Sequence, residues 1–206
     1  MNHEQRAKRS SFVEYLRRRQ AKRQPSGEVV NETKRQNLLA HRFLVMEHIS
    51  SALQGLNVPY AIIGGHAVTY HGRPRMTDHI DLLVAPEDLQ NAFTQLQLEQ
   101  VSPLRKGGYT GTTPTGVRID LVSPNQPWVA PAIANSISTA HGPMVSSPYL
   151  VISKLWDSRG SQDETDVLGV LGRMGDDELN ATRQLVAQFL PNDVDDLKSL
   201  ISMRHY

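Results

Sequence analysis

The segment YAIIGGHAVTYHGRPRMTDHIDLLV, residues 60–84, constrains the fold of this chain more than any other part of it. It begins with a short apolar run that two glycines end, as is typical of a buried strand. Residues 66–72 have room for two helical turns, and the apolar run at 79–84 indicates a second strand. This order of strand, glycine turn, helix and strand predicts a sheet that is covered by helices.

The second of these strands carries polar side chains on one face. Successive side chains of a strand point to opposite faces, so His79 and Asp81 share a face with Leu83. Asp78 points away from that face or precedes the strand. His79 and Asp81 are therefore two adjacent candidate metal ligands.

A further carboxylate, Asp120, lies within another strand-like apolar run. A carboxylate in a buried strand is costly unless it has a charged partner or binds a metal. One alternative is an ion pair with Arg118, two residues earlier on the same face. The other is a cation site shared with Asp81, where Mg²⁺ would bridge nucleotide phosphates. In that case Gly64 and Gly65 would let the phosphates approach the backbone closely, at the start of a helix.

Helical periodicity marks much of the remaining chain. Residues 39–53 carry one apolar stripe, and Gly55 is expected to end that helix. Pro86 is expected to start a helix, and residues 108–122 are typical of a hairpin with the turn TPTG. Four more helices are expected at about 147–156, 162–172, 176–190 and 193–204.

Together these elements predict an α+β fold, with a mixed β-sheet flanked by helices, an N-terminal helical arm and a C-terminal helical part. The length of 206 residues suits one medium domain with an accessory part. We expect a basic arm and linker at 1–30, a core at 31–147 and a helical region at 148–206.

Composition excludes several classes of site. The chain has no cysteine, which rules out disulfides, thiolate metal sites and cysteine nucleophiles. No apolar run is long enough to span a membrane, and the first residues lack the apolar core of a signal peptide. We therefore expect a cytoplasmic protein without a membrane partner.

The net charge of +1 is unevenly distributed along the chain. Residues 1–24 hold eight Lys or Arg and two Glu, a net charge of +6, so the other residues sum to −5. Ser11 and Glu14 have the spacing of a capping box and predict a short basic helix at about 11–23. Three alternatives stay open for this arm: docking on RNA or an acidic partner, a helix that forms a homodimer, or a solvated terminus.

The sequence also resembles a known family. The stretch GGHAVTYHGRPRMTDHIDLLV is similar to the signature of nucleotidyltransferase-fold proteins, the DNA polymerase β-like superfamily, and in particular of AbiEii-type nucleotidyltransferases from prokaryotic toxin–antitoxin systems. Their pattern is GG-x-A, a helix and R-x-T-x-D-x-D, and a later block is a Lys followed by R-x-x-x-D-x-x-D. The resemblance covers about residues 37–172. The matching residues are Gly64, Gly65, Ala67, Arg75, Thr77, Asp81, Asp120, Lys154, Arg159, Asp163 and Asp166.

The resemblance implies a metal-dependent transfer of a nucleoside monophosphate from an NTP to an acceptor. The implied acceptor is an RNA 3′ end, such as that of tRNA, or a protein hydroxyl, and an antitoxin protein is an implied partner. The implied ligands of Mg²⁺ or Mn²⁺ are His79, Asp81 and Asp120. The implied nucleotide-binding residues are Gly64, Gly65, Arg75, Thr77, Lys154 and Arg159, with Asp81, Asp120 and Lys154 as catalytic residues and Asp163 and Asp166 supporting the cations.

His79 departs from the family pattern, which has Asp at that position. The replacement removes one negative charge where dications gather, and one charge pair about 4 Å apart is worth roughly 4 kcal/mol at an effective dielectric near 20. Imidazole also suits Mn²⁺ or Zn²⁺ better than Mg²⁺, so we expect weaker Mg²⁺ binding and slower catalysis. The alternative is a degenerate nucleotidyltransferase fold that binds nucleotide, RNA or protein without chemistry. Tyr70 and Arg73 are expected near the pocket.

Overall fold

The computed structural model describes residues 46–73, 77–157 and 160–204, all within the compact unit of residues 40–206. The expected basic helix at 11–23 and the motif residues Arg75 and Arg159 lie outside the described residues. The described chain starts inside a helix that ends at residue 55. The later elements, in chain order, are β1 (Tyr60–Ile63), α3 (Gly64–Tyr70), β2 (Ile80–Val84), α4 (Leu89–Leu96), β3 (Glu99–Pro103), β4 (Gly108–Thr112), β5 (Arg118–Val122), α5 (Val129–Ala134), β6 (Ile137–Thr139), β7 (Gly142–Met144), α6 (Ser147–Trp156), α7 (Ser161–Leu171), α8 (Asp176–Phe189), the short 3₁₀ helix η1 (Pro191–Asp193) and α9 (Val194–Met203).

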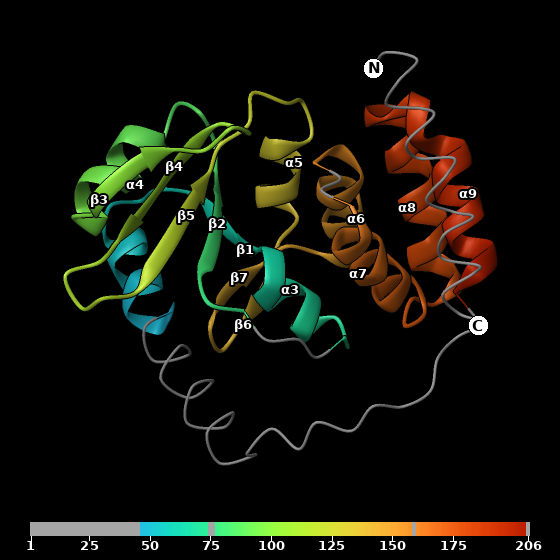
Figure 1. Ribbon diagram of the computed structural model, residues 1–206, viewed down its shortest axis with the longest axis horizontal. Helices are drawn as coiled ribbons and strands as arrows, with labels where there is room; N and C mark the ends of the chain where they lie inside the picture. The colour runs from blue at the N-terminus through green and yellow to red at the C-terminus, as the bar shows by residue number, and fades with distance from the viewer. Residues whose placement is uncertain (1–45, 74–76, 158–159, 205–206) are drawn as a thin grey trace. The chain divides into compact units, whose positions relative to one another are not determined.

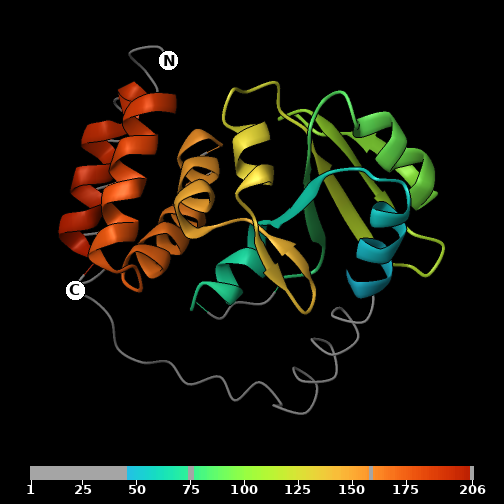
Figure 2. The same cartoon turned by 180° about the vertical axis from the view of Figure 1, so that it is seen from behind.

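The strands of the described residues form one mixed sheet in the order β3-β4-β5-β2-β1-β7-β6. β2 runs parallel to β5 and β1 runs parallel to β7, while the other neighbours are antiparallel. Figures 1 and 2 show α4 and the helix that ends at residue 55 on one side of the sheet, and α3, α5 and the C-terminal helices on the other. The predicted α+β fold with a mixed sheet flanked by helices is confirmed.

The central strands are covered on both faces. Every residue of β1 and of β2 is buried, which explains why both strands are almost continuously apolar. The exception is Asp81, a carboxylate in the second residue of β2 that is only 6% exposed. The fold therefore holds an acidic side chain in its interior, where an unpaired charge is strongly disfavoured.

The helix predicted to end with Gly55 ends slightly later. Gly55 is its last helical residue, and the left-handed position is Asn57, with φ of 56°. The backbone amides of Asn57 and Val58 donate to the carbonyls of Gln54 and Leu53. This is a Schellman motif, in which Asn replaces the more common glycine.

The helix α4 begins later than the sequence indicates. It was predicted to start at Pro86, but α4 begins at Leu89. The backbone amide of Asp88 donates to the carbonyl of Ala85 (3.0 Å), so residues 86–88 form a turn before the helix begins.

The hairpin at 108–122 is confirmed. β4 and β5 pair antiparallel, and across the TPTG turn the amide of Gly116 donates to the carbonyl of Thr113 (2.8 Å). The predicted C-terminal helices are present as α6–α9, to within one residue at each end. Five short elements were not predicted: β3, β6, β7, α5 and the 3₁₀ helix η1. Within the described ranges, no helix has the length and apolar character that a bilayer crossing requires.

Candidate metal and nucleotide site

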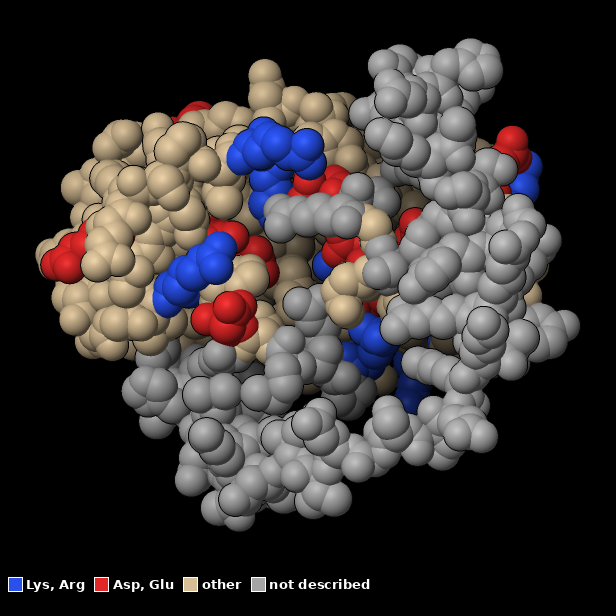
Figure 3. All heavy atoms as spheres, in the orientation of Figure 1, with Lys and Arg blue, Asp and Glu red and all other residues tan. Residues whose placement is uncertain are grey.

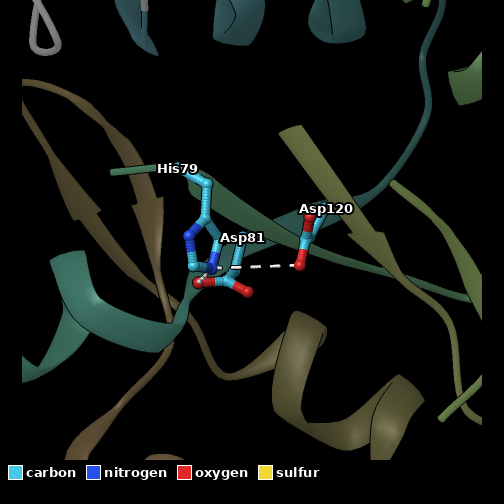
Figure 4. Close-up of side chains that lie close together, drawn as sticks. All are labelled: His79, Asp81 and Asp120. Carbon is cyan, nitrogen blue, oxygen red and sulfur yellow. Dashed lines mark ion pairs between the residues drawn. The ribbon is translucent and has the colours of Figure 1, made fainter. Parts of the chain in front are cut away.

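Two buried carboxylates lie side by side at the centre of the sheet. Asp81 on β2 and Asp120 on β5 are register partners on parallel neighbouring strands, so their side chains share one face. His79, which precedes β2 directly, adds an imidazole from the same side. Its Nε2 lies 3.4 Å from Asp81 Oδ2 and 3.8 Å from Asp120 Oδ2 (Figure 4). Alternation in the sequence predicted this grouping, although β2 begins at Ile80, one residue later than expected.

Gly64 closes this site from the end of β1. Its φ of +70° is left-handed, and an added Cβ would lie 1.9 Å from Asp81 Oδ2. A side chain at this position is therefore excluded both by backbone strain and by the carboxylate. The close approach of Asp81 thus explains why position 64 is a glycine, at the point where α3 starts immediately after β1.

Asp120 has two different environments at its two oxygens. The hydroxyl of Thr110 donates to Oδ1 (2.6 Å), and Arg118 Nε lies 3.5 Å from the same oxygen. Oδ2 is the oxygen that faces His79. Oδ1 thus has the ion pair with Arg118 that the sequence offered as one alternative, and Oδ2 faces His79, where the other alternative would place a cation.

His79 lies among three carboxylates. Its Nδ1 is 2.7 Å from Asp78 Oδ1, on the solvent side, while Nε2 faces the two buried aspartates. The hydrogen bond to Asp81 is the main cause that raises the pKa of His79 to about 9, although burial acts against it. Burial alone would raise the pKa of Asp81, but the hydrogen bond and charge of His79 lower it. In this arrangement His79 is an imidazolium at neutral pH.

A second charged cluster connects α6 to α7. Lys154 Nζ donates to Asp163 Oδ1 (2.6 Å) and Asp166 Oδ2 (3.2 Å). Asp166 is fully buried and also accepts hydrogen bonds from Gln162 and from Arg73. Asp163 and Asp166 thus hold the ammonium group of Lys154 between them.

His79 and Asp81, together with Lys154 and Asp163, line one pocket of about 800 Å³, its open mouth included. Figure 3 shows basic and acidic side chains next to one another on this face of the molecule. The predicted residues that line the pocket are Gly64, Gly65, His79, Asp81, Lys154 and Asp163.

Other predicted residues lie outside the lining, among them Asp120 and Asp166, which contact His79 and Lys154 of the lining. Thr77 is buried, and its hydroxyl donates to the carbonyl of His79 (3.0 Å), so it fixes the turn before β2. Arg73 contacts Asp166 behind the lysine. Tyr70 is half exposed at the end of α3 and does not line the pocket.

Sequence reasoning missed several lining residues. Lys106, from the turn between β3 and β4, lines the pocket and lies 3.5 Å from Asp157 Oδ2. Trp128 and Trp156 form an apolar wall, with ring centroids 5.9 Å apart in an edge-to-face arrangement. The Trp128 indole N–H is buried without a hydrogen-bond partner among the described residues. These are the only tryptophans of the chain, which was a usable signal in the sequence.

The arrangement of His79, Asp81 and Asp120 can hold a metal ion. Each residue offers one ligand atom, and the three atoms lie within 4.8 Å of one another. Two buried carboxylates that face one point repel each other unless a positive charge lies between them. Carboxylate oxygens suit Mg²⁺ and Mn²⁺, and an imidazole nitrogen suits Mn²⁺ and Zn²⁺. The donor set therefore fits a divalent cation.

Comparisons with known proteins add limited information. A scan against protein-family models and a search of curated proteins both give no match. Among solved structures, the antibiotic-resistance factor ANT(2'')-Ia is similar with 18% identity, 72% of this chain and 92% of that chain covered, and a TM-score of 0.49. An antigenic nucleotidyltransferase-like protein from Paracoccidioides brasiliensis has 19% identity, covers 76% of this chain and 92% of its own, and gives a TM-score of 0.46. JHP933 from Helicobacter pylori has 11% identity, covers 82% of this chain and 90% of its own, and gives a TM-score of 0.44. At these low values, the function of this chain has to be argued from its own side chains.

Proposed function

We propose that this chain is a metal-dependent nucleotidyltransferase, which moves a nucleoside monophosphate from an NTP to an acceptor. One observation carries the proposal. Asp81 and Asp120 lie on adjacent parallel strands and converge with His79 on one point, and Asp81 and His79 line the pocket that also contains Lys154. Buried carboxylates beside a positioned lysine are what phosphoryl transfer requires, because that chemistry depends on placing cations around phosphate oxygens.

The charge of the pocket supports the need for a divalent ion. Its lining holds three acidic residues, Asp81, Asp157 and Asp163, against Lys106, Lys154 and the imidazolium of His79. These charges balance, and Asp120 and Asp166 lie directly behind them. A triphosphate carries several negative charges, so it needs additional cations to enter a pocket that has no positive excess.

The residues of the pocket have separate tasks in this proposal. A divalent ion held by His79, Asp81 and Asp120 would supply Lewis acidity at the phosphoryl group and at the acceptor hydroxyl. Lys154, held in place by its two aspartates, presents an ammonium group to the phosphates. Gly64 has no side chain, so it leaves room for phosphate beside Asp81. The acceptor hydroxyl gives up its proton to solvent, its oxygen bonds to the α-phosphorus as the bond to the bridging oxygen breaks, and pyrophosphate leaves.

The acceptor is proposed from two features of the sequence, the resemblance and the basic arm. The AbiEii-like motifs favour an RNA 3′ end, such as that of tRNA, or a protein hydroxyl, and a role as the toxin of a pair with an antitoxin protein. The basic arm at 1–24, with its net charge of +6, favours an RNA acceptor over a protein.

Transfer is tested with labelled NTPs, total RNA or cell protein, and Mg²⁺, Mn²⁺ or Zn²⁺ in parallel. We expect metal-dependent labelling of the acceptor by the parent chain and none by Asp81→Asn, which keeps the shape but not the charge. Asp177→Asn, an exposed substitution on α8, is the matched control. The proposal fails if the parent labels no acceptor with any of these ions.

A second function is favoured by the charge state of His79. The imidazolium already lies beside Asp81 and Asp120 and supplies a positive charge there without a metal. A chain with such a built-in cation would bind nucleotide, RNA or protein without chemistry. In that case the parent binds NTP but transfers nothing, and transfer appears only in His79→Asp. Robust turnover by the parent excludes this second function.

A further inference from the structure

The side chain of His79 is held from both ends. On the solvent side, its Nδ1 lies 2.7 Å from Asp78 Oδ1. On the inner side, its Nε2 faces the Oδ2 atoms of Asp81 and Asp120. The backbone is fixed as well, because Thr77 donates a hydrogen bond to the His79 carbonyl. The orientation of this imidazole is thus determined by its neighbours.

The contact with Asp78 determines which nitrogen is available as a ligand. An ionised carboxylate only accepts hydrogen bonds, so Nδ1 must carry a hydrogen in this contact. Nε2 is then the ring nitrogen that is left for a metal, and it points toward the two buried carboxylates. Metal-binding histidines show the same arrangement, with the second ring nitrogen donating to a carboxylate that fixes the tautomer and the ring.

The spacing of the three ligand atoms fits one small ion. Ligands about 2.0–2.1 Å from a tetrahedral ion lie roughly 3.3–3.4 Å apart. The observed separations from Nε2 are 3.4 Å to Asp81 Oδ2 and 3.8 Å to Asp120 Oδ2. Among the described residues, Asp120 Oδ1 is poorly placed to hold a second ion, because it accepts from Thr110 and lies next to Arg118. Asp78 faces solvent, with 79% of its side chain exposed.

We propose that His79, Asp81 and Asp120 form a single-ion centre that binds Zn²⁺ and Mn²⁺ in preference to Mg²⁺, and that Asp78 is a positioning residue for its histidine ligand. The expected order of affinity is Zn²⁺, then Mn²⁺, then Mg²⁺. An imidazole ligand favours the first two ions, whereas Mg²⁺ prefers an octahedron of oxygens and loses its waters reluctantly. The inference deepens the proposed function, but ion binding is measured without any nucleotide.

Calorimetric titration of the metal-free full-length chain with each ion tests the centre. We expect one ion per chain and at least about tenfold tighter binding of Zn²⁺ than of Mg²⁺. Fluorescence gives a second readout, because both tryptophans of the chain line the pocket. His79→Ala should abolish this preference, whereas His48→Ala, an exposed histidine on the helix that ends at residue 55, should leave it unchanged. Equal affinities for Zn²⁺ and Mg²⁺, or two ions per chain, would overturn the inference.

Two substitutions separate the roles of the ligand and its partner. His79→Asp restores an all-oxygen site, so Mg²⁺ should bind more tightly and the preference for Zn²⁺ should shrink. Asp78→Asn should weaken Zn²⁺ binding by about tenfold, the lower end of the usual effect for such partners, because Asp78 is largely exposed. Asp177→Asn is its matched control. A purely structural role for Asp78 would instead lower the melting temperature of the metal-free chain and leave the Zn²⁺ affinity unchanged.

The outcomes distinguish this inference from the proposed function. Preferential Zn²⁺ binding without nucleotidyl transfer supports the centre and contradicts the transferase. If transfer occurs with Mg²⁺, and Mg²⁺ binds at least as tightly as Zn²⁺, the result supports the transferase and contradicts the single-ion centre.

Discussion

The interaction of His79 with the buried carboxylates predicts a specific dependence of stability on pH. The pKa of His79 is about 9 in the folded chain and about 6.5 when unfolded. The folded state therefore binds this proton more strongly, so the stabilisation is complete below about pH 6.5 and is lost as the pH rises toward 9. His79→Gln removes this proton-binding group while keeping a polar side chain of similar length.

The magnitude follows from the difference between the two pKa values. Each unit of difference corresponds to about 1.4 kcal/mol, so the full effect is roughly 3 kcal/mol. The His79 side chain is 21% exposed, and solvent screening reduces the effect, so we expect about 1–3 kcal/mol. Between about pH 6 and pH 9.5, the free energy of unfolding of the parent should fall by this amount relative to His79→Gln.

Urea titrations at several pH values, with a chelator present to remove metal ions, measure this difference. His48→Gln serves as the control, because His48 is exposed on the helix that ends at residue 55. The reasoning is refuted if the difference between the parent and His79→Gln stays constant, or grows, as the pH rises through this window.

Three other perturbations have defined expected results. Gly64→Ala should lower the free energy of unfolding by at least about 1–2 kcal/mol, which is the cost of a left-handed alanine. It should also weaken metal binding, because the new Cβ displaces Asp81. An unchanged urea midpoint contradicts this prediction. Asp166→Asn should cost about 3 kcal/mol in the same titration, because it leaves Arg73 without the buried carboxylate that it contacts and Lys154 with Asp163 alone; a cost below about 1 kcal/mol would show that the cluster is not stabilising. Deletion of residues 1–24 should weaken RNA binding and flatten its dependence on salt; an unchanged slope of affinity against salt concentration contradicts a role of the arm in RNA binding.

The elements that the sequence predicted well are those with strong local signals. β1 and β2 are apolar runs bounded by glycines or polar turns, and the β4–β5 hairpin contains a Thr-Pro-Thr-Gly turn. The missed strands lack such signals. β3 is fully exposed at one edge of the sheet, so its residues need no apolar alternation. β6 and β7 have three residues each, and β7 is Gly-Pro-Met.

The candidate site was predictable only in part, for a similar reason. Alternation within one strand placed His79 beside Asp81, and the motif resemblance pointed to Asp120 and Lys154. Lys106 comes from a turn and Trp128 from the N-terminal end of α5, and their presence at the pocket depends on long-range packing. The exact relation of Asp81 to Asp120 also depends on a parallel pairing between strands that are distant in sequence, which no local pattern encodes.

The most direct test of the central claim is transfer of labelled nucleotide by the full-length parent chain with Zn²⁺, Mn²⁺ or Mg²⁺, with Asp81→Asn and His79→Asp assayed beside it. The account predicts labelled acceptor from the parent with Mn²⁺ or Zn²⁺, none from Asp81→Asn, and a shift toward Mg²⁺ in His79→Asp. Labelling of the acceptor by Asp81→Asn at the rate of the parent would contradict it, because the reaction would then not depend on the buried carboxylate at the centre of the site.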